Sequence, residues 1–245
     1  MKELKYHNHL KGDLAIKGLG RLNSEEEAAE AELHKKYQLN ALRLSFKPSG
    51  ATLASLSSGR QVRQQKPETL VVERLMESLL EVLKPHPNLK KLTIYQNMGF
   101  RYPGWMGSTE ALTNLRYLGL HNCSNCTELP SLGLLPSLEV DTFTPFPKLT
   151  VLEITDMSSL EVVDLGEIVE GKGESRELQH LNIYANLDDS IKLIPEYVQN
   201  LTKLQHLMIY SYGKEQEVGD WSILSYIPSV TLNGKKIRSI NQNSQ

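Results

Sequence analysis

The segment LRYLGLHNCSNCTELPSLGLLP, residues 115–136, decides how this chain folds. It opens with Leu115, Leu118 and Leu120 in the order L-x-x-L-x-L, and Cys123 follows three residues later. Leu118 and Leu120 are two residues apart, so a short strand points both side chains to the same side, and Leu115 closes the turn leading in. One such unit cannot bury its own leucines, so its stability requires similar units that stack on it.

Copies of this pattern recur over nearly the whole chain, which identifies it as a leucine-rich repeat. Several intervals between successive middle leucines, 26, 20, 29 and 26 residues, lie at or near the period of such repeats. Two intervals differ: 50 residues separate Leu42 from Leu92, which leaves room for an extra element, and only 14 separate Leu138 from Leu152. The further copies are Leu39-Leu42-Leu44, Leu89-Leu92-Ile94, Leu135-Leu138-Val140, Leu149-Leu152-Ile154, Leu178-Leu181-Ile183 and Leu204-Leu207-Ile209.

The repeats predict an α/β repeat solenoid. In this leucine-rich-repeat horseshoe, a parallel β-sheet lines the concave side and the convex side is irregular and partly helical. We expect a single repeat domain over residues 1–240, with irregular repeats in 1–88, regular repeats in 89–232 and a polar tail at 241–245.

Both ends of the solenoid depart from the regular pattern. Leu14 and Ile16 alternate with polar neighbours and predict an early strand that has no clear polar cap. Near the other end, Val230 and Leu232 alternate before the tight-turn pair Asn233-Gly234, after which the chain is polar. We interpret this second segment as a last strand or cap.

Two helices and one loop fill the irregular half. Ser24 can cap a helix with acidic residues 25–27 in its first turn and basic residues 34–36 in its last, and its charge run is interpreted as a solvated face. Residues 70–83 have helical spacing and stop before Pro85. The segment 47–66, rich in Ser, Gly, Gln and basic residues, predicts a mobile loop.

Composition excludes several classes of function. The chain has 27 basic and 29 acidic side chains and a net charge of −2, so it has no broad basic field for nucleic acid. No apolar run reaches the roughly 18 residues of a membrane span, and the polar start MKELKYHNHLKGD is not a signal peptide. We therefore expect a cytoplasmic protein with no membrane span.

The motifs that could carry chemistry are incomplete. Cys123 and Cys126 form Cys-x-x-Cys without a second pair, and Cys123 fits the Asn/Cys position of the repeat. Residues 166–173 match the phosphate-loop pattern G-x-x-x-x-G-K. The Ser or Thr that binds magnesium in that motif is replaced here by Gly173. Trp105 is interpreted as a plug in the core rather than a ligand-binding residue. We predict no catalytic, cofactor-binding or metal-ligating residue, no cofactor, and no enzymatic activity.

The candidate site is the concave face. The side chains that directly follow the second strand leucine point away from the core, and the stacked strands align them. Their aromatic content is typical of protein interfaces, and we prefer that interpretation to the alternative that tyrosine merely suits exposed strands. The aligned residues are Lys17, Ser45, Tyr95, His121, Thr155, Tyr184 and Tyr210, of which Tyr95, His121, Thr155, Tyr184 and Tyr210 are the candidate partner-binding residues.

Several longer phrases make the resemblance more specific than generic repeats. The chain resembles the leucine-rich-repeat region of plant intracellular disease-resistance proteins, the coiled-coil nucleotide-binding (NB-LRR) class. The segment between LPSLE and FPKL is shorter here than in most of that family. The phrases are LKGDLAIKGLGRL (10–22), AEAELHKKYQLNALRLSF (29–46), LKPHPNLKKLTIY (83–95), YPGWM (102–106), LTNLRYLGLHNCSNCTELPSLGLLPSLE (112–139) and FPKLTVLEITDM (146–157).

The resemblance implies a function in plant defence. In that family the repeats restrain the nucleotide switch and contribute to recognition, so the implied partners are a pathogen effector, a guarded host protein, or the nucleotide-binding domain of an immune receptor. The preferred hypothesis is a non-enzymatic recognition and regulatory scaffold. Two alternatives stay open: part of an ADP/ATP-binding immune switch whose nucleotide-binding domain is not in this chain, and a general adaptor such as a substrate receptor for ubiquitin ligation.

Overall fold

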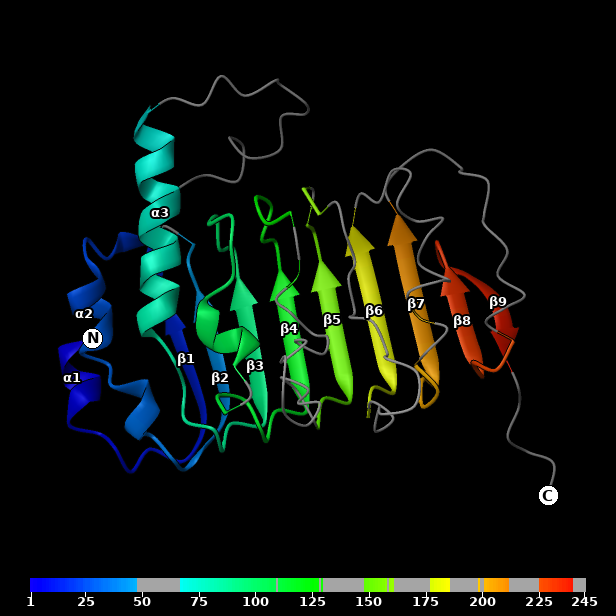
Figure 1. The fold of residues 1–245 in the computed structure, drawn as a ribbon, viewed down its shortest axis with the longest axis horizontal. Coiled ribbons are helices and arrows are strands. Elements are labelled where there is room, and N and C mark those ends of the chain that lie inside the picture. The colour runs from blue at the N-terminus through cyan, green and yellow to red at the C-terminus, as the bar shows by residue number, and fades with distance from the viewer. Residues whose placement is uncertain are drawn as a thin grey trace, which may run out of the picture.

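One open β-sheet organises the protein (Figure 1). The computed structural model describes residues 1–47, 67–108, 110–127, 129, 148–157, 159–160, 177–185, 198, 201–211 and 225–239. Within these residues nine strands follow one another across the sheet in chain order. They are β1 (Gly12–Lys17), β2 (Leu39–Ser45), β3 (Lys91–Tyr95), β4 (Tyr117–His121), β5 (Val151–Thr155), β6 (His180–Ala185), β7 (His206–Ser211), β8 (Ser229–Leu232) and β9 (Lys235–Ser239).

The strands from β1 to β8 are parallel, and their leucines are in register. Leu92 pairs with Leu118, and Leu118 pairs with Leu152, so each repeat lays its middle leucine against the middle leucine of the next. The early strand also fits this scheme, since Leu14 pairs with Leu42. The predicted solenoid with a parallel sheet is therefore confirmed.

The last strand, β9, runs antiparallel to β8. Asn233 and Gly234 have φ angles of 47° and 76°, the left-handed pair that a tight hairpin turn needs. The polar residues 235–239 that follow this turn form a strand, which the sequence analysis did not predict. Backbone hydrogen bonds make a strand there although Lys235 and Lys236 are exposed, because pairing with β8 does not require apolar side chains. Residues 241–245 lie outside the described residues.

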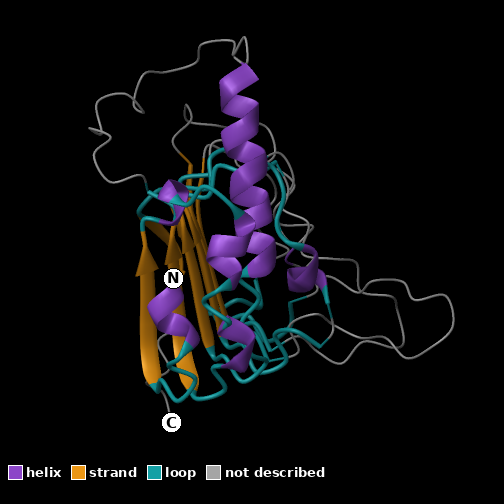
Figure 2. Cartoon of the chain, turned by 90° about the vertical axis from the view of Figure 1, so that its left-hand side faces the viewer, coloured by secondary structure: helices purple, strands orange, loops and turns teal. Residues whose placement is uncertain are grey.

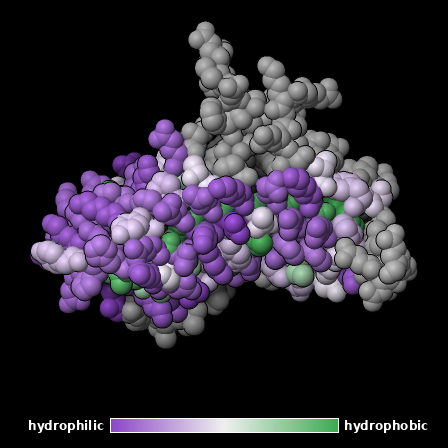
Figure 3. Space-filling model, turned by 90° about the horizontal axis from the view of Figure 1, so that it is seen from below, coloured by the Kyte–Doolittle hydropathy of each residue, from purple (hydrophilic) through white to green (hydrophobic). Residues whose placement is uncertain are grey.

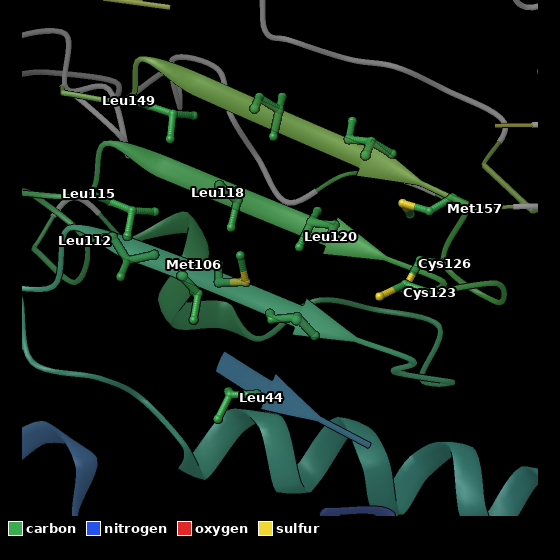
Figure 4. Close-up of a cluster of buried hydrophobic side chains, with 14 of the residues drawn as sticks. Leu44, Met106, Leu112, Leu115, Leu118, Leu120, Cys123, Cys126, Leu149 and Met157 are labelled. Carbon is green, nitrogen blue, oxygen red and sulfur yellow. The ribbon is translucent and has the colours of Figure 1, made fainter. Parts of the chain in front are cut away.

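Helices and turns cover one face of the sheet and leave the other face open (Figure 2). The helical segments are α1 (Lys2–Lys5), α2 (Glu25–Ala29), α3 (Pro67–Val82) and the 3₁₀ turns η1 (Leu19–Arg21), η2 (Leu33–Lys35) and η4 (Gly104–Gly107). The core lies between the two layers, where Leu115, Leu118, Leu120 and Met106 are fully buried and belong to one hydrophobic cluster (Figure 4). Trp105 of η4 is also buried and donates its indole N–H to the Leu80 carbonyl at 3.2 Å, as expected of a core plug.

Three strands end in the same left-handed turn. Gln96, Asn122 and Asp156 follow β3, β4 and β5 with φ angles of 56°, 56° and 53°. Each donates its backbone N–H to a carbonyl of the next repeat, at 2.7–2.8 Å. The residue after each is buried; Cys123 is one of the three, which confirms its place in the turn leaving the strand. This turn fixes the strand ends of neighbouring repeats to each other.

Helix α3 confirms the helix predicted at residues 70–83. Two of its glutamates form hydrogen bonds with the following repeat. The carboxylate of Glu77 accepts hydrogen bonds from the backbone N–H groups of Phe100 at 2.6 Å and Arg101 at 3.1 Å. Glu81 accepts from the Gly104 N–H at 2.8 Å. These carboxylates provide hydrogen-bond acceptors for backbone N–H groups of the loop that would otherwise have to bind water. Of the predicted loop at 47–66, residues 48–66 lie outside the described residues.

The helix predicted over residues 24–36 is shorter than expected. Ser24 does cap α2, accepting the Glu27 N–H at 3.4 Å, but Glu32 has a φ angle of 44° and separates α2 from η2. The charge run is also not wholly solvated, because Lys36 is buried and donates to the Leu4 carbonyl at 2.6 Å and to Asn8 Oδ1 at 3.1 Å. Burial lowers the pKa of the Lys36 ammonium group. This lysine ties the first ten residues to the β1 end of the sheet.

Some expectations concern residues whose structure is not described. They are the repeat at Leu135-Leu138-Val140, the short interval that follows it, and the phosphate-loop imitation at 166–173. Within the described ranges, no helix combines the length and the apolar composition that crossing a membrane would require.

Replacing Leu118 by Ala should lower the free energy of unfolding by about 2–5 kcal/mol, because a fully buried leucine leaves a cavity between two stacked repeats. Chemical denaturation followed by circular dichroism measures the change. The control is Val71→Ala on α3, where the valine is 67% exposed and little apolar contact is lost. An unchanged midpoint for Leu118→Ala would contradict the repeat assignment.

Candidate functional site

The open face of the sheet presents three rows of side chains that alternate with the buried leucines. The outer row, at the strand ends, is the row predicted from the sequence, and strand register aligns its members. None of its members is buried. The outer row is Lys17, Ser45, Tyr95, His121, Thr155, Tyr184 and Tyr210; the middle row is Arg43, Thr93, Gly119, Glu153, Asn182 and Met208; the inner row is Lys91, Tyr117, Val151, His180 and His206.

Three outer-row residues form one connected unit across β3, β4 and β5. The rings of Tyr95 and His121 stack with centroids 4.6 Å apart and planes 16° apart. His121 Nδ1 lies 2.7 Å from Thr155 Oγ1, at hydrogen-bonding distance. Burial lowers the pKa of His121, while the carboxylates of Glu153 and Asp156 act in the opposite direction. The structure therefore holds this imidazole in place and favours its neutral form.

A second unit occupies the inner and middle rows beside it. Tyr117 donates its hydroxyl to Glu153 Oε2 at 2.5 Å, and Lys91 Nζ lies 4.1 Å above the Tyr117 ring. Burial, followed by the Glu153 carboxylate, raises the pKa of the Tyr117 hydroxyl. Gly119 makes room for both units: a Cβ there would lie 2.7 Å from His121 Nε2 and 3.0 Å from the Tyr117 ring.

The third unit lies on β6 and β7. Tyr184 and Tyr210 stack with centroids 6.2 Å apart, and the Tyr184 hydroxyl donates to the sulfur of Met208 at 2.7 Å. His180 and His206 stack more closely, with centroids 4.5 Å apart and planes 8° apart. This part of the open face is aromatic, and its described side chains carry no carboxylate or ammonium group.

The strand register places the five predicted residues in one row on five consecutive strands. Tyr95 stacks on His121, His121 lies at hydrogen-bonding distance from Thr155, and Tyr184 stacks on Tyr210. Thr155 and Tyr184 are register partners across β5 and β6, so the two groups are neighbours in the same row. Sequence reasoning missed Tyr117, Glu153 and the histidine pair. The same two-residue alternation would have found them, because the positions two and four residues earlier point to the same face.

The cysteines have the environment of core residues. Cys123 and Cys126 are free and buried; Cys126 Sγ donates to the Gly99 carbonyl at 3.1 Å. Burial raises the pKa of Cys123 to about 11 and raises that of Cys126 further. A thiol in this environment is a poor nucleophile, since the thiolate is the reactive form. Among the described residues there is no group of three or more His, Cys, Asp or Glu side chains placed to hold a metal ion.

The edge of the sheet where the strands begin differs from the buried face in hydropathy (Figure 3). Seen from this side, the surface is mostly hydrophilic. Exposed Lys90 and Arg116 directly precede β3 and β4, and Lys148 donates to Asn114 Oδ1 at 2.7 Å. This edge therefore presents mainly polar side chains.

Lowering the pH from 7.5 to 5.5 should destabilise the protein partly through His121. Because burial lowers the folded-state pKa of His121 below its ordinary value of 6.5, the unfolded chain binds the proton more readily. Stability is thus lost as the pH falls through 6.5 toward the folded-state pKa. Denaturant unfolding at several pH values should show a shallower loss for His121→Gln than for the parent. Equal slopes for the two proteins would contradict this contribution.

Comparison with known proteins agrees with this geometry. Residues 1–143, more than half of the chain, match the family model described as R13L1/DRL21 LRRs. The chain is 33% identical over 175 residues to disease resistance protein RGA1 and 28% identical over 178 residues to disease resistance protein RGA2, both of Solanum bulbocastanum. It is 30% identical over 139 residues to disease resistance RPP13-like protein 1 of Arabidopsis thaliana.

These matches cover most of the chain but a small part of the relatives. They span 65%, 65% and 57% of this chain and 16%, 16% and 12% of RGA1, RGA2 and the RPP13-like protein. They support the resemblance to the repeat region of plant disease-resistance proteins. On the family match and the in-register repeats, the chain belongs to the R13L1/DRL21 family of leucine-rich repeats.

Proposed function

We propose that this chain is a non-enzymatic recognition and regulatory scaffold in plant defence, and that it binds a protein partner on the open face of its sheet. The observation that carries the proposal is the placement of stacked aromatic side chains along that face. Tyr95 with His121, and Tyr184 with Tyr210, project from strands whose other face is the buried core. The names of the relatives supply the biological process.

The geometry suits binding for two physical reasons. Tyrosine is enriched among the residues that dominate interface energies, because one ring combines a large apolar surface with a hydroxyl. Stacking and strand pairing also restrict these rings before any partner arrives, so less side-chain entropy is lost on binding. A face whose side chains are already ordered therefore binds more tightly than a flexible face that makes the same contacts.

The charged side chains around Tyr117 support selectivity between protein partners. Lys91 and Arg43 add positive charge near Tyr117, whereas the β6–β7 part of the face is uncharged in its described side chains. A partner must therefore match a charged part and an uncharged part of the face in the correct order along the sheet. Such a pattern rejects wrong partners through unpaired charges as well as through shape.

The proposed partners are proteins: a pathogen effector, a guarded host protein, or the nucleotide-binding domain of an immune receptor. We place this recognition in the cytoplasm, where receptors of the resembling class act. The scaffold role requires no catalytic group on this chain, and the buried thiols offer no reactive alternative.

The test replaces Tyr95, Tyr184 and Tyr210 by Ala and compares proximity labelling and pull-down in plant cells with the unchanged chain. Binding of the recovered partner should weaken by at least about tenfold, since loss of hot-spot aromatics commonly costs 2 kcal/mol or more in total. The circular dichroism spectrum and melting temperature should change little, because none of the three tyrosines is buried.

The matched control replaces Tyr6 and Tyr37, which are 81% and 44% exposed and lie outside the sheet's open face. This double variant should recover the same partner as the unchanged chain. Equal loss of binding in both variants, or unfolding of the triple variant, would count against a recognition role for the open face.

A further inference from the structure

The histidine pair on β6 and β7 has features that the aromatic interface does not require. His180 and His206 are directly paired in the strand register, so the backbone ladder fixes the distance between their Cα atoms. Their rings lie nearly parallel at a centroid distance of 4.5 Å. Both side chains are accessible on the open face, His206 more so than His180. Two imidazoles are thereby held side by side with solvent access.

The backbone places uncharged neighbours on both sides of the histidine pair. Their register neighbours on the adjoining strands are Val151 and Ser229, which carry no charge. A neutral imidazole keeps one ring nitrogen free as a metal ligand, whereas an imidazolium does not.

The distances are compatible with chelation. Zinc–imidazole bonds are about 2.0–2.1 Å, so two nitrogens in neighbouring coordination positions lie roughly 3–3.5 Å apart. Paired residues on adjacent strands are about 4.8 Å apart, and imidazole rings can tilt about the broad Cβ–Cγ torsion toward a common point. Only the rings must move, because the strands already hold the backbone in place.

We propose that His180 and His206 form a two-imidazole site for a divalent transition-metal ion such as Zn²⁺ or Ni²⁺. The choice of metal follows from ligand type, since imidazole suits zinc, copper and nickel better than magnesium or calcium. The described residues place no third His, Cys, Asp or Glu beside the pair. The proposed site therefore counts two protein ligands from the described residues, and we expect a lower affinity than at a closed four-ligand site. This site does not depend on the proposed defence function.

The experiment titrates Zn²⁺, and separately Ni²⁺, into the full chain by isothermal calorimetry at pH 7.5 in a buffer that does not chelate metals. The variants His180→Gln and His206→Gln each remove one ligand while keeping a polar side chain on the open face. The control His7→Gln with His9→Gln removes two imidazoles from the N-terminal segment. In parallel, NMR of the unchanged chain follows the ring signals of His180 and His206, a readout that does not depend on whether a variant folds.

We expect saturable binding of one ion and a loss of affinity of roughly tenfold or more in each single variant, because even an outer-shell contact is commonly worth 10–100-fold. The control should bind as the unchanged chain does, and the two ring signals should shift together during titration. Absence of saturable binding up to about 1 mM metal, the weak end of specific affinities, would overturn the proposal. Equal affinity in all variants, or shifts confined to other histidines, would overturn it as well.

Discussion

Each repeat of this protein buries its leucines only because the next repeat lies in register with it. Leu92, Leu118 and Leu152 form a continuous line across β3, β4 and β5, and each is fully buried. Burying one leucine side chain is worth about 1.5–3 kcal/mol. A one-residue slip between two strands would exchange the buried and open faces and lose this contribution at every pair. The hydrophobic contact between repeats therefore fixes the register.

That register also determines what the open face can hold. Neighbouring parallel strands lie about 4.7–4.9 Å apart. This spacing is close to the distance between the centroids of two slightly tilted, stacked rings. The centroid distances of 4.6 Å for Tyr95 with His121 and 4.5 Å for His180 with His206 reflect this spacing. The rings of Tyr117 and His121 approach the middle row at Gly119, where the absence of a side chain leaves room for them. Side chains on the open face are thus positioned by a core to which they do not belong.

The fold was predictable because its determinants are short-range and repeated. The L-x-x-L-x-L spacing predicts strands at Leu118 and Leu152 without knowledge of their partners, and stacking follows from the need to bury them. Lys36 shows where this reasoning fails: its burial depends on carbonyls of residues 4 and 7, about thirty positions away in the chain. In the candidate site, periodicity locates Tyr95 and Tyr184 on one face. It does not reveal which rings stack, because that depends on side-chain torsions and on room such as Gly119 provides.

The two faces of the sheet are under different physical constraints. A change at Leu118 affects the packing of the repeats on either side, whereas a change at Tyr184 alters the open face through its stacking on Tyr210 and its hydrogen bond to Met208. On the covered side, Glu77 and Glu81 of α3 accept backbone N–H groups of the segment that follows β3, so the long segment between β2 and β3 is held against the next repeat. Open-face side chains can therefore vary while the leucine ladder stays the same. A solenoid of this kind separates the residues that maintain the fold from those free to specify a partner.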